Sequence, residues 1–282
     1  MENIIKKERP GIQRRKDEHA ARTITRIWDE QALEGNPYLA EHCRCRGYDL
    51  LELMEKRSLV DVLYLLLRGE LPSRDQARLL ETLMVAFINP GPRHPATRAA
   101  MNAGVGKTYP VHILPISLSV AGGDYLGGGE VAEAMLFLKK HLKADPAKIA
   151  TDLLDNTTPP EKGDWHIAPG FGCRFGGTDP LPQEIAVKLA ALPGNGRALQ
   201  WGSAFADALK PHGMGWVSTG VCAAAFLDLG FVSRTGPGLF QLICAPGLLA
   251  HGLELATKTI NAMPFIDEEH YVIEPEAKTQ KT

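Results

Sequence analysis

The stretch that decides the fold of this chain is Pro169-Gly170-Phe171-Gly172-Cys173-Arg174-Phe175-Gly176-Gly177-Thr178-Asp179-Pro180. Its four glycines and two prolines predict a turn-rich loop, because glycine adopts positive φ and proline fixes its own. No repetitive sequence surrounds the stretch, so it is not a low-complexity segment. A single cysteine and a single arginine lie at its centre and give it chemistry as well as shape.

The composition is that of a globular protein. With 282 residues and 44% hydrophobic content, the chain is long enough for one large domain, or for a domain with a smaller lobe. Its formal charge is -2, and the one modest basic run lies at residues 6–16, so a nucleic-acid partner is not predicted.

Three sequence features bear on localisation. The first thirty residues are charged and lack a signal-peptide core, and no run of about 18 apolar residues occurs. We therefore expect neither secretion nor a membrane partner. Five cysteines are an odd and sparse set that fits a reducing cytoplasm, and His42-Cys43-Arg44-Cys45 is spaced too tightly for a metal site.

Helical periodicity dominates the chain and strand signals are almost absent, which predicts an all-α class. Ser58 and Ser73 start two helices through N-caps, and Asp145 starts a third with Pro146 in its first turn. We expect residues 1–18 and 275–282 to fray. The predicted helices cover 59–67, 74–87, 131–142, 146–154, 182–192, 198–209, 220–229 and 246–261.

Glycine- and proline-rich loops lie between these helices at 89–95, 122–129 and 155–180. Long loops in a compact helical protein are commonly functional. The third loop contains Trp165, His166 and Phe171, which favours an ordered conformation.

Several segments, in order, resemble the citrate synthase superfamily and most closely its citryl-CoA lyase branch. The resemblance spans about residues 23–275. Residues 169–180 resemble the signature GFGHRxxxxDPR with its histidine replaced by Cys173. The other matching segments are Arg46-Gly47-Tyr48-Asp49, Gly122-Gly123-Asp124-Tyr125-Leu126-Gly127-Gly128-Gly129 and Pro264-Phe265-Ile266-Asp267.

The resemblance implies a helical homodimer in which a large lobe carries a small lobe, here at about 130–215 of a single domain 1–282. Members make or break a carbon–carbon bond next to the carbonyl of a CoA thioester. The expected ligand is therefore an acyl-CoA, with no covalently bound cofactor and no metal. Such chemistry needs a base near the α-carbon and a donor at the developing oxyanion.

The charged catalytic positions that the family carries are substituted in this chain. Three family histidines correspond to Pro90, Leu126 and Cys173, and the family carboxylate corresponds to Trp216. The two arginines correspond to Leu181 and Cys244. The resemblance therefore implies an apolar pocket, which cannot hold a tricarboxylate because burying unpaired charge is costly.

The remaining candidates leave alternatives open. His212, His94 and His166 are the candidate bases, in that order. Cys173 is either a thiolate nucleophile or, as we favour, a small apolar filler. Arg174 either meets a phosphate or carboxylate or faces solvent. The further CoA-binding candidates of the two glycine loops are Gly127, Gly128, Gly170 and Gly172.

Two functions follow. The first is an enzyme that acts on a carbon–carbon bond of a non-citryl, more apolar acyl-CoA, for example one with a bulky hydrophobic or alicyclic acyl group, as a retro-Claisen lyase or a hydrolase. The second is a catalytically silent CoA-ligand binder or a partner subunit of an active homologue. In either case we expect Asp179 to cap a helix, and His112 and His251 to be core residues.

Overall fold

In the computed structural model, which describes residues 19, 21–161 and 163–274, the chain divides after Arg57 into two units, Met1–Arg57 and Ser58–Thr282. The predicted frayed ends, residues 1–18 and 275–282, lie outside the described residues. The small lobe expected at about 130–215 stays a prediction.

The described part of the first unit is mainly an antiparallel sheet of β1 (Trp28–Leu33), β2 (Asn36–Cys45) and β3 (Tyr48–Asp49), followed by α1 (Leu50–Lys56). The strictly all-α prediction is wrong here. Every residue of β1 is exposed, so the strand lacks the alternation of buried and exposed positions that a sequence pattern would reveal. Asp49 then starts α1 by accepting a hydrogen bond from Leu51 N.

The second unit begins with two capped helices, and both starts were predicted correctly. Ser58 and Asp61 form a reciprocal capping box at α2 (Leu59–Arg68), which ends at Gly69 with φ 83°. Ser73 and Gln76 form the same box at α3 (Arg74–Phe87). The two boxes fix these boundaries through contacts within three residues of sequence.

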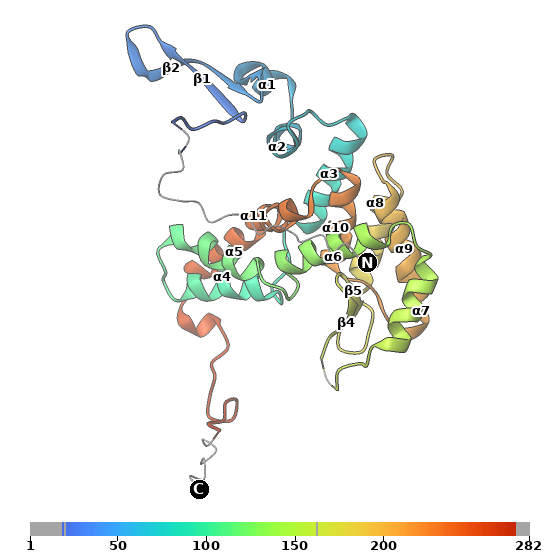
Figure 1. Ribbon diagram of the computed structural model, residues 1–282. Coiled ribbons are helices and arrows are strands. Elements are labelled where there is room, and N and C mark those ends of the chain that lie inside the picture. Colours follow the sequence, from blue (N-terminus) through green and yellow to red (C-terminus); the bar gives the residue numbers. More distant parts are fainter. Residues whose placement is uncertain (1–18, 20, 162, 275–282) are drawn as a thin grey trace. The chain divides into compact units, whose positions relative to one another are not determined.

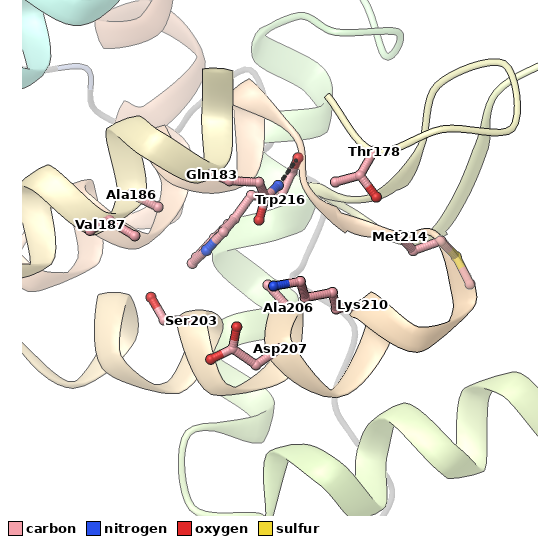
Figure 2. Close-up of a pocket in the computed structure, with 10 residues that line it drawn as sticks. All are labelled: Thr178, Gln183, Ala186, Val187, Ser203, Ala206, Asp207, Lys210, Met214 and Trp216. Carbon is pink, nitrogen blue, oxygen red and sulfur yellow. Dashed lines mark hydrogen bonds between the residues drawn. The ribbon is translucent and has the colours of Figure 1, made fainter. Parts of the chain in front are cut away.

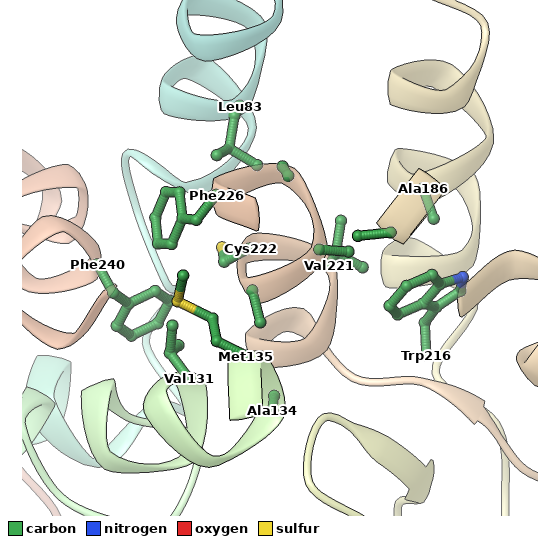
Figure 3. Packing of buried hydrophobic residues seen from close by; sticks show 14 of the residues in the cluster. Leu83, Val131, Ala134, Met135, Ala186, Trp216, Val221, Cys222, Phe226 and Phe240 are labelled. Atoms are coloured by element: carbon green, nitrogen blue, oxygen red, sulfur yellow. The ribbon is translucent and has the colours of Figure 1, made fainter. Parts of the chain in front are cut away.

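The centre of the second unit is α10 (Ser218–Asp228), in which eight consecutive residues, Thr219 to Phe226, are buried. A helix buried on all sides lies in the middle of a core. Figure 3 shows α10 between Met135 of α6 (Gly128–His141) and Ala186 of α8 (Pro180–Ala190). Also packed against α10 is α9 (Arg197–Leu209).

The longest helix is α11 (Gly236–Ala256), which packs against α4 (Pro95–Val105) and α5 (Ile113–Ala121) (Figure 1). It begins at Gly236 rather than at the predicted Pro246, which lies inside the helix. Among the described residues, Ser233–Ala256 is the one helix long and apolar enough to span a membrane by length and composition alone. It packs on α4 and α5, and 44% of its most apolar window is buried.

A second antiparallel sheet joins β4 (Trp165–Ala168), β5 (Phe171–Cys173) and β6 (Gly215–Trp216). Phe171 pairs with Trp216, so the sheet ties the signature loop to the segment just before α10. Strands of two to four residues carry too little pattern to predict. The remaining α-helix is α7 (Pro146–Asn156), capped by Asp145 as predicted.

Candidate functional site

A pocket of about 140 Å³, here called the inner pocket, lies where the three predicted loops approach α3, α8, α10 and α11. Seven of its twelve lining residues are apolar. Those seven are Phe87, Pro90, Leu126, Leu181, Pro182, Phe240 and Cys244; the other five are Arg93, His94, Arg174, Asp179 and Ser218.

A larger and more open pocket of about 710 Å³, the outer pocket, adjoins the inner one. Pro90, Arg93, Arg174 and Asp179 line both. The rest of the outer pocket comes from the loop around Gly91 and from residues 175–180. The two pockets are therefore neighbouring parts of one site, with two arginines and one carboxylate at their junction.

The backbone of Leu126 is held in a strained conformation at the wall of the inner pocket. Its φ is 54°, in the left-handed region that a bulky side chain rarely adopts. Glu130 Oε2 accepts a hydrogen bond from Leu126 N at 3.1 Å, and His94 Nε2 lies 2.9 Å from Leu126 O. Such strain persists only where the surroundings enforce it, so these two side chains position Leu126.

His94 has no ring nitrogen free for catalysis. Its Nδ1 accepts a hydrogen bond from Ala96 N at 3.1 Å and so caps α4, and its Nε2 is left to donate to Leu126 O. Burial lowers the pKa of His94, and the positive charge of Arg174 lowers it further, against the raising effect of the Leu126 hydrogen bond. This candidate base is thus a neutral imidazole with both ring nitrogens in hydrogen bonds.

His166 forms a buried pair with Glu130. Its Nδ1 lies 2.5 Å from Glu130 Oε1, which also accepts from Gly170 N at 3.3 Å. The hydrogen bond to Glu130 raises the pKa of His166, although burial opposes the shift. The Tyr125 ring stacks on the imidazole with centroids 6.1 Å apart. His166 lines neither the inner nor the outer pocket, so this candidate base lies behind the pocket wall.

A second buried carboxylate holds Arg174. Asp164 Oδ2 accepts from Arg174 Nε at 3.1 Å and from the Tyr125 hydroxyl at 2.5 Å, and Asp164 Oδ1 accepts from Phe175 N at 3.1 Å. Arg174 is therefore an oriented arginine at the junction of the two pockets, not a free solvent-facing one. Arg93, by contrast, is exposed and makes no hydrogen bond or ion pair with any described residue.

The other two catalytic candidates lie together elsewhere. Cys173 and His212 line a separate pocket of about 510 Å³ with Trp165 and residues of the 159–163 loop. Cys173 is 9% exposed and belongs to the hydrophobic core cluster, whereas His212 is exposed. Cys173 and His212 thus line a different pocket from His94 and Arg174, although Phe175 lines both this pocket and the outer pocket.

The four candidate CoA-binding glycines have packing roles, and none of them lines the inner pocket, the outer pocket or the pocket of Cys173 and His212. A Cβ at Gly170 would overlap the backbone of Gly220, and one at Gly172 would overlap Trp165 O. A Cβ at Gly127 would meet the carbonyl of Gly123, and one at Gly128 would meet Pro237. Close backbone approach therefore accounts for these glycines.

Other sequence predictions have mixed outcomes. Asp179 caps α8 as expected, by accepting from Leu181 N. His112 is exposed, so the prediction that it is a core residue is wrong. His251 is partly exposed, with Nε2 3.2 Å from Asn89 Oδ1. Trp216 packs on Phe171 and does not line the inner pocket, so it makes no part of its apolar wall.

Within residues 19, 21–161 and 163–274, no group of three or more His, Cys, Asp or Glu side chains is arranged to hold a metal ion.

No family model and no curated protein match the sequence. Solved structures do match. Citryl-CoA lyase from Hydrogenobacter thermophilus is 25% identical, with a TM-score of 0.72 over 92% of this chain and 97% of that one. ATP citrate lyase from Methanothrix soehngenii, in complex with citrate and coenzyme A, is 17% identical with a TM-score of 0.67, over 92% of this chain and 44% of that one. Citrate synthase from Thermoplasma acidophilum is 19% identical with a TM-score of 0.58, over 78% and 58%.

The chain belongs to the citrate synthase superfamily. This membership agrees with the resemblance seen in the sequence, and the fold is mostly helical as the superfamily requires. Four of the six residues that the sequence resemblance pairs with catalytic positions of the superfamily, Pro90, Leu126, Leu181 and Cys244, line the inner pocket. The other two, Cys173 and Trp216, line other pockets.

Sequence reasoning missed four residues of this region. Arg93 and Ser218 line the pocket, and Glu130 and Asp164 support it from behind. Arg93 directly precedes His94, a predicted candidate base, so it could have been chosen from the sequence. Nothing local marks Glu130 or Asp164, because Gly170 lies 40 residues from Glu130, and Tyr125 and Arg174 lie 39 and 10 residues from Asp164.

Proposed function

We propose that this protein is an acyl-CoA lyase of the citrate synthase superfamily that cleaves the carbon–carbon bond next to the thioester carbonyl of a compact acyl group more apolar than citryl. The observation that carries the proposal is the inner pocket itself. Four positions that are charged or imidazole-bearing in the family are apolar here and face one cavity of about 140 Å³. Such a wall favours hydrocarbon and penalises an unpaired carboxylate.

The charge at the pocket junction limits the substrate further. Arg174 is already paired with Asp164, so Arg93 is the cation with no partner among the described lining residues. One such arginine matches one carboxylate or phosphate. The outer pocket, of about 710 Å³, offers the space for part of the CoA moiety, with Arg93 and Arg174 beside it.

We assign proton transfer to Asp179 rather than to His212, His94 or His166. Asp179 is the one carboxylate among the residues that line the inner and outer pockets. Its Oδ1 accepts a hydrogen bond from Leu181 N, so Oδ2 is the oxygen available to take a proton. In a 3-hydroxyacyl-CoA, Oδ2 would take the hydroxyl proton. The C2–C3 bond would break, C3 would become a carbonyl, and the released enolate would take a proton at C2 to give the shorter acyl-CoA.

The experiment screens 3-hydroxyacyl-CoAs with zero or one extra carboxylate for release of acetyl-CoA. For any substrate found, Asp179→Asn should lower kcat about 10²-fold or more, whereas Asp145→Asn should leave it unchanged. The two aspartates are matched, because each caps a helix whose first residue is proline, and asparagine also caps. Equal activity of both variants would refute the role of Asp179.

A second candidate, the catalytically silent CoA-ligand binder or partner subunit, is favoured by one observation. The only imidazole of the inner pocket, that of His94, has both ring nitrogens in hydrogen bonds. A silent binder would be stabilised by CoA or an acyl-CoA in a thermal-shift assay while releasing no product. Stabilisation at 100 times the dissociation constant amounts to about 2.7 kcal/mol.

Citrate chemistry gives a further test of the substrate class. We predict that the protein neither makes citrate from acetyl-CoA and oxaloacetate nor cleaves citryl-CoA, because the pocket lacks the cations to pair with a tricarboxylate. Turnover of either substrate at about 1 per second or more would contradict the proposal.

We further propose a cytoplasmic homodimer. All five cysteines are free, which suits a reducing compartment. Val111, Ile116 and Val120, on and just before α5, are exposed apolar side chains that a partner copy would cover. Light scattering at micromolar concentration should give the mass of two chains, and a monomer would argue against this assembly.

A further inference from the structure

A further cavity lies between α8 and α9 (Figure 2). Its volume is about 290 Å³, and it shares no lining residue with the inner pocket and only Thr178 with the outer pocket. Nothing in the proposed lyase reaction uses it. Ligand pockets generally run from about 300 to 1,000 Å³, so this one suits a small molecule.

The floor of this cavity is preformed. The Trp216 indole is 2% exposed and stacks on Phe171 with ring centroids 4.5 Å apart. Gln183 Nε2 donates to the backbone O of Trp216 at 2.9 Å, and a Cβ at Gly202 would overlap the six-membered edge of the indole. Phe171 and Gly202 therefore fix the ring, Gln183 fixes its backbone, and the floor of the cavity is a rigid apolar surface. Ala186, Val187, Ala206 and Met214 extend that surface.

Two opposite charges stand over this floor. Asp207 on α9 and Lys210 in the turn that follows it are three residues apart in the sequence. Figure 2 shows both, together with Ser203, across the cavity from Trp216 and Gln183. Neither charged side chain makes a hydrogen bond or ion pair with any described residue. The cavity thus offers one unpaired anion, one unpaired cation and a hydroxyl beside an apolar surface.

We propose that this cavity binds a free α-amino acid with an apolar side chain. An α-amino acid carries a carboxylate and an ammonium on one carbon, which match Lys210 and Asp207, and its side chain would lie on Trp216 and Met214. A simple anion would be repelled by Asp207, and a simple amine would be repelled by Lys210. The proposal is independent of the lyase function.

The test measures binding of L-leucine, L-methionine and L-phenylalanine by calorimetry at millimolar concentration. Two analogues of leucine each remove one charge: 4-methylpentanoate lacks the ammonium and 3-methylbutylamine lacks the carboxylate. We expect at least one amino acid to bind. Both analogues of leucine should bind about tenfold or more weakly than leucine, since each loses a charged contact.

Variants locate the site. Asp207→Asn and Lys210→Gln should each weaken amino-acid binding about tenfold or more, while Lys188→Gln, an exposed lysine of α8 that does not line the cavity, should not. All three positions are exposed, and circular dichroism will verify that the variants fold. The proposal is overturned if none of the three amino acids binds, if either cavity variant binds like the wild type, or if 4-methylpentanoate binds as tightly as leucine.

Discussion

The wall of the inner pocket and the layer directly behind it have opposite characters. At the wall, Pro90, Leu181 and Cys244 are apolar, and the sequence resemblance pairs these positions with charged or imidazole side chains. Behind it, Glu130 binds His166 and Asp164 binds Arg174 in buried, charge-assisted hydrogen bonds. The loops of this site are held mainly by Glu130 and Asp164, neither of which lines the inner or the outer pocket, together with His94, which does line the inner pocket. The pocket can therefore change its chemistry while its loops keep their places.

Removal of Glu130 tests most directly whether the layer behind the wall supports the loops. Glu130→Ala leaves Leu126 N, Gly170 N and the His166 imidazole without their acceptor, so we expect a loss of about 3–5 kcal/mol in the free energy of unfolding. Urea denaturation measures it. Glu133→Ala, at an exposed position of the same helix, is the control. Equal losses for the two variants would show that the layer behind the wall does not support the loops.

Gly170 tests whether packing explains the glycine loops. Gly170→Ala forces φ 79° on an alanine and drives its Cβ into Gly220, so we expect a loss of about 2–4 kcal/mol. Gly177→Ala, in the same loop, meets only an ordinary contact and should change stability little. If Gly170→Ala were as stable as the wild type yet lost CoA binding, the glycine would be a ligand contact instead.

The pH dependence of the free energy of unfolding tests the pair of His166 and Glu130. Because the Glu130 hydrogen bond raises its pKa above 6.5, the folded state binds this proton more tightly than the unfolded state does. The stabilisation is fully present below pH 6.5 and is lost as pH rises through the folded pKa. His166→Gln should therefore cost about 1.5–3 kcal/mol at low pH and progressively less above it. His112→Gln, at an exposed position, should show no such dependence in urea titrations at several pH values.

Cys173 should give the smallest effect. As a nearly buried filler, its change to alanine should cost about 1 kcal/mol and leave activity intact. Burial raises the pKa of Cys222 well above its usual value and that of Cys244 to about 12, so both should resist iodoacetamide. Partly exposed Cys43 should be labelled first. Labelling of Cys173 ahead of Cys43, with loss of activity, would restore its role as a nucleophile.

Local signals predicted the helix starts well. The boxes at Ser58 and Ser73 and the caps at Asp145 and Asp179 depend on partners within three residues, so they can be read from sequence. Helices α1, α4 and α5 were not predicted, and the N-cap of α4, His94, is an unusual one that lies inside a proline-rich loop.

The supporting layer could not be predicted in the same way. Glu130 reaches residues 36 and 40 positions away, at His166 and Gly170, and nothing in its own neighbourhood distinguishes it from a surface glutamate. The family resemblance identified the positions that surround the inner pocket. It did not show that Trp216 turns away from that pocket, because the direction follows from stacking on Phe171.

The proline inside α11 has a consequence for how this protein can diversify. Pro246 has no N–H, and Gly247 N donates to Ile88 O at 3.0 Å outside the helix. The interruption separates a first segment, which carries Phe240 and Cys244 to the pocket, from a second segment, whose Gly252 packs on Ala100 of α4. Mutations that retune the pocket in the first segment need not propagate to the second, so selection can alter specificity without sacrificing the scaffold.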